Sequence, residues 1–113
     1  MEASATIRFL RVSPRKARLV ADEVRGKMVG DALSVLQFGI TKGVSTDILK
    51  LIKSAVANVQ SRQSDTAVDP EELKVKEIRV DDGPRLGRFR ARAQGRVGRI
   101  TKRMCHITVT VAN

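Results

Sequence analysis

From Arg85 onward the sequence has eight basic side chains and no carboxylate. These are Arg85, Arg88, Arg90, Arg92, Arg96, Arg99, Lys102 and Arg103. Residues 1–84 hold the other 14 basic residues and all 12 acidic residues, so they contribute only +2 of the net charge of +10. Like charges on paired strands repel each other, and this segment has little apolar bulk for a core. The core must therefore come from the rest of the chain, and a basic arm over about residues 85–100 needs a polyanion around it.

The length and composition favour a single cytoplasmic domain. A chain of 113 residues with 42% hydrophobic residues supports one core. We expect one domain over residues 1–113, with a body made of residues 1–84 and 101–113 and the arm between them. No run approaches the roughly 18 apolar residues of a membrane span, and no apolar signal region follows Met1, so neither membrane insertion nor secretion is expected. The single cysteine fits a reducing cytosol. The net charge points to nucleic acid or an anionic membrane surface as partner.

Three segments are predicted to form helices. Ser13 and Pro14 favour a helix start, with Ser13 as the N-cap and Pro14 at the first helical position, and Gly26 ends this helix. A short second helix is expected over residues 31–39, with Asp31 as its cap. The third helix begins near residues 45–46, and its apolar residues recur at helical spacing on one face. That face comprises Val44, Ile48, Leu51, Ile52, Ala55, Val56 and Val59.

Three segments are predicted to form strands, over Thr6–Val12, Leu73–Val80 and Met104–Val111. In the last of these, apolar and polar residues alternate, as expected for a strand with one buried face. Asp81–Pro84 is expected to end the second strand in a turn. Strands near both ends of the chain with helices between them predict an α+β fold. In this fold three helices pack on a three-stranded antiparallel sheet, and a long basic β-hairpin protrudes.

The arm is predicted to be the far end of that hairpin. In an extended chain, Arg88, Arg90 and Arg92 project from one side and the residues between them from the other. A free two-stranded ribbon is marginal in water, so we expect the arm to become ordered on RNA or DNA. The three aromatic residues are too few for a platform of several stacked rings. Recognition should therefore run mainly through phosphates, sugar and shape.

The first helix carries a second group of basic residues near its start. Arg15, Arg18 and Arg25 lie along one polar face, where a phosphate would offset their unfavourable position in the helix dipole. The alternative is a solvated face with an Arg18–Asp22 pair at i, i+4. We expect phosphate contact by this face.

Two short motifs invite catalytic or metal-binding interpretations. Cys105 and His106 are the only cysteine and histidine, and zinc usually needs four such ligands, so a core thiol beside a surface or RNA-facing imidazole is expected. Asp81 and Asp82 are suited to Mg²⁺ in principle, but they precede Gly83-Pro84 and favour a turn. No serine–histidine arrangement or Gly-rich phosphate loop is present. We expect no enzyme activity, no metal and no cofactor.

Several ordered motifs together resemble the family of large-subunit ribosomal protein twenty-two. They are Ser13–Asp22 with Arg25–Lys27, Lys53–Asn58, Val75–Ile78, Val80–Pro84, Arg92–Arg96, Lys102–Arg103 and His106–Val109. The resemblance covers nearly the whole chain. It implies a compact domain on the outer surface of the large ribosomal subunit, with the hairpin threading through ribosomal RNA and supporting subunit assembly. Its implied partners are that RNA, neighbouring large-subunit proteins and the nascent polypeptide, with no membrane contact and no homo-oligomer.

The resemblance also implies roles for particular residues. The expected ribosomal RNA contacts are Arg15, Lys16, Arg18, Arg25, Arg85, Arg88, Arg90, Arg92, Arg96, Arg99, Lys102 and Arg103. The hairpin tip, which in this family lines the nascent-peptide exit tunnel, is expected at Leu86, Gly87, Arg88, Phe89, Arg90, Ala91, Arg92 and Ala93.

Two other function classes remain as alternatives. A free DNA- or RNA-binding module more often shows a recognition helix or a dimer seam, whereas the third helix here has a buried apolar face and exposes lysines. A small nuclease would have to rely on Asp81 and Asp82. The ribosomal interpretation is the one we favour.

Overall fold

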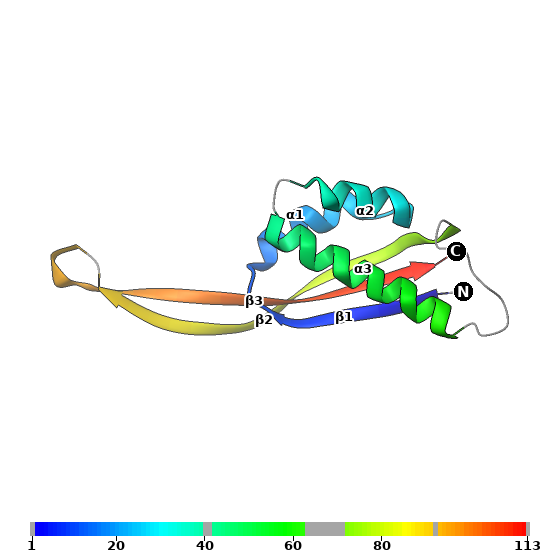
Figure 1. Ribbon diagram of the computed structural model, residues 1–113. Helices are drawn as coiled ribbons and strands as arrows, with labels where there is room; N and C mark the ends of the chain where they lie inside the picture. The colour runs from blue at the N-terminus through cyan, green and yellow to red at the C-terminus, as the bar shows by residue number, and fades with distance from the viewer. Residues whose placement is uncertain (1, 40–41, 63–71, 92, 113) are drawn as a thin grey trace.

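The computed structural model describes residues 2–39, 42–62, 72–91 and 93–112. The elements follow the order β1 (Glu2–Leu10), α1 (Pro14–Val24), α2 (Val29–Gln37), α3 (Lys42–Arg62), β2 (Lys74–Ala91), the short 3₁₀ helix η2 (Ala93–Gly95) and β3 (Val97–Ala112). The three helices lie on one side of the sheet, and the β2–β3 hairpin runs far beyond them (Figure 1). The expected α+β fold is confirmed.

The central strand β3 organises the sheet, whose strand order is β1-β3-β2 with antiparallel pairing throughout. Ile107 of β3 pairs with Ile7 of β1 and with Val80 of β2. The odd-numbered residues of β3 from Cys105 to Val111 are buried against the helices. The even-numbered residues are only partly buried and face the other side. The sheet therefore has one apolar face and one polar face.

The helices follow from their caps and apolar faces. The Ser13 hydroxyl accepts a hydrogen bond from the Lys16 amide at 3.4 Å, and Gly26, at φ +79°, follows the end of α1. In α3 the expected apolar face is buried, except that Val56 is only partly buried. The helix begins at Lys42, a few residues before the expected start.

The start of α2 differs from the expectation. Its N-cap is Met28, without a side-chain hydrogen bond, and Asp31 lies in the first turn. The Val29 amide instead donates to the Leu73 carbonyl at 3.0 Å, and Met28 forms an isolated bridge with Lys74. The Leu73 carbonyl thus satisfies an amide at the start of α2 that a capping side chain often satisfies.

All three strands differ in extent from the predicted ranges. β1 starts at Glu2 rather than Thr6 and ends at Leu10 rather than Val12. A turn was expected at Asp81–Pro84, but β2 does not end there. The strand continues through a bulge between Asp82 and Arg85, and such a bulge absorbs residues that would otherwise break the ladder. A Cβ on Gly83 would lie 3.1 Å from the Met104 backbone, so a larger residue there would have to push β3 away by a few tenths of an ångström.

The hairpin gives the molecule an elongated shape. Its principal extents are 66 × 25 × 16 Å and its radius of gyration is 17.2 Å, whereas a compact domain of this length has a radius of about 13 Å. No helix in the described residues is long and apolar enough to cross a membrane.

Candidate nucleic-acid interface

The arm presents positive charge on both faces of a paired ribbon. Residues directly opposite each other share a face, so the register assigns each cation to one side. Arg88, Arg90 and Lys102 lie on one face, because Arg88 pairs with Ile100, Arg90 with Gly98 and Leu86 with Lys102. The other face carries Arg85, Arg99 and Arg103, with Phe89 opposite Arg99. The ribbon therefore has no neutral side.

Among the residues that the structure describes, no carboxylate neutralises these cations. The ion pairs found among the described residues all lie in the body, and none involves an arm cation. Arg88 donates to the carbonyl of its own neighbour Gly87 at 2.9 Å, which leaves its charge uncompensated. Arg96 is exposed near the far end. Arg92, another expected contact, lies outside the described residues.

The chain reverses direction at η2, where Gln94 and Gly95 have φ values of 62° and 72°. The expected tip, residues 86–93, therefore covers mostly the outgoing strand. Leu86 and Gly87 lie in the paired ribbon, well before the reversal. Phe89 is 77% exposed, so its ring is open to whatever surrounds the arm.

A hollow of about 460 Å³ lies where the arm leaves the body. Arg11, Arg88, Lys102 and Arg103 contribute to its lining, together with Ser13 at the start of α1. Four cations around one hollow are an arrangement suited to an anion. Arg11 was not among the expected contacts. The sequence signal that could have found Arg11 is its position two residues before Ser13, the N-cap of α1, which lines the same hollow.

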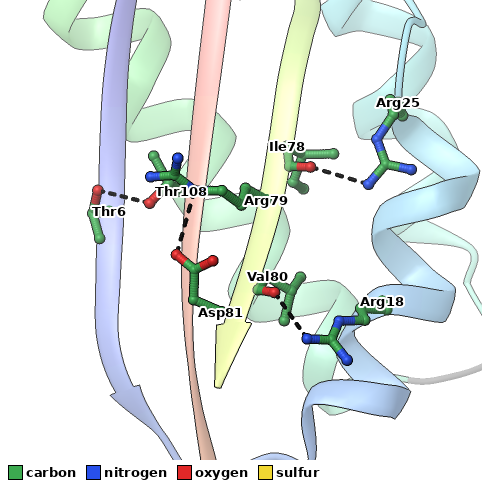
Figure 2. Close-up of polar contacts among 8 residues, drawn as sticks. All are labelled: Thr6, Arg18, Arg25, Ile78, Arg79, Val80, Asp81 and Thr108. Carbon is green, nitrogen blue, oxygen red and sulfur yellow. Dashed lines mark hydrogen bonds and ion pairs between the residues drawn. The ribbon is translucent and has the colours of Figure 1, made fainter. Parts of the chain in front are cut away.

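Arg18 and Arg25 of α1 have an unexpected structural role (Figure 2). Arg18 donates through Nη2 to the Val80 carbonyl at 3.3 Å, and Arg25 donates through Nη2 to the Ile78 carbonyl at 3.0 Å. Both carbonyls belong to β2, an edge strand of the sheet. An open edge exposes unpaired backbone groups, and these two side chains cover part of it.

The ion pairs around α1 also differ from the Arg18–Asp22 pair that was considered as an alternative to phosphate contact. Asp22 pairs with Arg25 rather than with Arg18, whose Nη2 lies 3.6 Å from Oδ1 of Asp82. In contrast, Arg15 and Lys16 are exposed and form no ion pair within the described ranges. At the start of α1 they are the cations most available to an external anion.

Comparisons with known proteins assign the chain to a family. The family model described as Ribosomal protein L22p/L17e matches residues 5–112. The chain belongs to this family. It is 53% identical over 112 residues to the large ribosomal subunit protein uL22 of Leptospira biflexa, covering 99% of this chain and 94% of that protein. It is 48% identical over 116 residues to the protein of the same name from Bifidobacterium animalis subsp. lactis, covering 100% of this chain and 96% of that protein.

Membership of the L22 family makes the chain a structural constituent of the large ribosomal subunit, which is cytoplasmic in bacteria, and not an enzyme. The residues considered for catalysis have other roles. Asp82 pairs with Arg18, and Asp81 Oδ2 lies 3.3 Å from Nε of Arg79. No group of three or more potential metal ligands occurs within the described part of the chain. Cys105 is buried in the core, as expected, and this burial raises the pKa of its thiol.

Proposed function

We propose that the protein binds large-subunit ribosomal RNA through the arm, the hollow at its base and the start of α1. The supporting observation is that cations occupy both faces of the arm and form no ion pair among the residues that the structure describes. A ribbon lying on a single nucleic-acid surface needs cations on one face only. Cations on two faces fit a segment with phosphates on both sides.

The mechanism is structural. Arm arginines neutralise phosphates from RNA segments on opposite sides of the ribbon, while Arg11 and Lys102 hold another at the base of the arm. Arg15 and Lys16 place further charge beside the N-terminal amides of α1, where an anion also gains from the helix dipole. A single copy thereby links separate RNA segments and supports subunit assembly.

We infer that the far end of the arm lines the nascent-peptide exit tunnel, as the family resemblance implies. The arm can reach far from the body because the molecule is 66 Å long. Its end carries three small residues, Ala91, Ala93 and Gly95, beside the longer side chains of Gln94 and Arg96. The partners are then the ribosomal RNA, neighbouring large-subunit proteins and the nascent polypeptide.

The RNA-binding proposal is tested by the salt dependence of affinity for a single-stranded ribosomal RNA fragment. Each phosphate contact contributes about −0.7 to the slope of log affinity against log salt concentration. An Arg88→Gln, Arg90→Gln double variant should therefore reduce the steepness by roughly 1.4. The matched control, Lys50→Gln with Lys53→Gln on α3, removes the same charge from the body and should leave the slope nearly unchanged. Equal slopes for the arm variant and the parent would remove the arm from the RNA-contact surface.

The tunnel proposal is tested by crosslinking on translating ribosomes. A photo-crosslinking side chain in place of Ala93 should react with the nascent polypeptide, whereas the same group in place of the exposed Leu19 on α1 should not. Crosslinks from residue 93 to RNA and other proteins alone would contradict the placement of the arm end in the tunnel.

A further inference from the structure

A second hollow lies on the polar face of the sheet, opposite the helices. Its volume is about 360 Å³, and it is lined by Arg8, Phe9, Arg79, Asp81, His106 and Thr108, among others. It belongs neither to the arm nor to α1. Of its lining residues, only His106 was expected to face solvent or RNA, and none was among the basic residues expected to contact RNA.

Phe9 reaches this hollow through an unusual backbone conformation. β1 has a bulge between Ile7 and Leu10, and Phe9 within it has φ +57°. In a regular strand Phe9 would share the helix-facing side with Ile7. The bulge instead leaves the ring 60% exposed. A phenylalanine at positive φ is strained, and strain of this kind concentrates at functional sites.

His106 holds Phe9 in place and adds a polar group. Its Nδ1 accepts a hydrogen bond from the Phe9 backbone amide at 3.0 Å. The two rings meet edge to face, with centroids 5.0 Å apart and an interplanar angle of 88°. Because Nδ1 is an acceptor, the proton lies on Nε2, which can donate to a ligand. The result is a small aromatic platform with a hydrogen-bond donor beside it.

The charged side chains around the platform favour binding of a single negative charge. Arg79 is paired with Asp81, whereas Arg8 is exposed and forms no ion pair within the described ranges. The three charged side chains therefore leave a net charge of +1 at the hollow. An aromatic ring with one available guanidinium is the combination that recognises an unpaired nucleotide, whose base stacks while its phosphate is neutralised.

The hollow also continues one face of the arm. Alternation along β3 puts Thr108, His106 and Lys102 on the same side of the strand. His106 lies four positions after Lys102, a distance of about 13 Å along an extended strand. An RNA strand bound to this face of the arm is therefore within reach of the hollow.

We propose that the hollow binds one unpaired nucleotide of RNA. The base stacks on Phe9, the phosphate contacts Arg8, and Nε2 of His106 donates to the base or the ribose. The inference takes its partner from the proposed function but concerns a separate surface, so each can fail without the other.

The test is nuclear magnetic resonance of the full-length labelled protein titrated with single-stranded tetra-adenylate. Stacking should shift the ring protons of Phe9 and the imidazole protons of His106. Tripolyphosphate, an anion of similar charge without bases, should not reproduce these shifts. Phe9→Leu keeps an apolar side chain but removes the ring, and affinity measured at His106 should fall on the order of tenfold. Phe38→Leu is the matched control, because Phe38 is 82% exposed after α2, in the helix layer.

A Phe9→Asn variant separates loss of the ring from loss of the fold, because asparagine tolerates the positive φ at this position. It should keep the parent's backbone spectrum and lose the tetra-adenylate shifts at His106. The Arg88→Gln, Arg90→Gln variant should retain these shifts.

Arm signals that respond while Phe9 and His106 stay unchanged would overturn this inference and leave the proposed function standing. Equal shifts with tripolyphosphate would reduce the hollow to a simple anion site. Equal shifts with tetraglutamate would assign it to an acidic protein segment. Either result would also overturn the inference.

Discussion

Arg15, Arg18 and Arg25 lie on the exposed side of one helix but have different surroundings. Arg18 and Arg25 donate to carbonyls of the β2 edge, whereas Arg15 is exposed and has no ion-pair partner in the described ranges. Helical spacing predicts that all three are on the polar face, and it cannot distinguish them further. The difference depends on which part of α1 lies beside β2, and only the tertiary structure determines that. The expected RNA role thus remains best supported at Arg15.

Replacing Arg25 with alanine should destabilise the fold because the Ile78 carbonyl loses a charged hydrogen-bond donor. Hydrogen bonds to charged groups contribute about 1.5–3 kcal/mol. The Arg25 side chain is 48% exposed and water can replace it, so we expect a loss of about 1 kcal/mol. Urea unfolding measures this change.

Arg15→Ala is the matched control and should change the free energy of unfolding by less than about 0.5 kcal/mol. It should instead weaken RNA binding. The structural assignment of Arg25 would be wrong if the two variants were equally stable.

The sequence predicts the elements of the body and the long hairpin, but it does not predict where the hairpin strands begin and end. Apolar periodicity identified the buried residues of α1, α3 and the body part of β3, since burial is what creates that periodicity. Beyond Val80 and before Met104 the strands leave the helices, so no buried face marks them. Backbone pairing nevertheless continues to Ala91 and Val97. Asp81–Pro84 predicts a turn from its residue types, but the structure has a bulge there, because the same residue types favour both.

The division into body and arm predicts that the body folds without the arm. We propose deleting residues 86–102 and joining Arg85 to Arg103, which face each other in the register, through an Asn-Gly turn. The core residues lie outside this deletion, so the free energy of unfolding should stay within roughly 1 kcal/mol of the parent.

Reaction of Cys105 with a thiol reagent provides a second measurement on this variant. The thiol is buried and its pKa is raised, so it should react only when the body opens. Rapid reaction in the folded deletion variant would show that the arm supports the core, and the proposed division would then be abandoned.

At the scale of the whole molecule, shape and charge point to the same partner. The body has the apolar face of a sheet covered by three helices, while the arm has a paired backbone and little apolar surface to bury. Two strands alone are marginal in water, and mutual repulsion between cations weakens them further. Phosphates on both faces would remove this repulsion. The arm is therefore expected to be stably ordered only in the ribosome.

Amide hydrogen exchange of the arm, in the free protein and in purified large subunits, tests this central claim most directly. In the free protein the amides of Arg88–Ala91 and Val97–Ile100 should exchange rapidly, while those of Ile48–Val59 in α3 remain protected. In the subunit the arm amides should become about as protected as those of the helix. Arm amides that are strongly protected in the free protein, or that exchange equally fast in both states, would contradict the claim that RNA completes the arm.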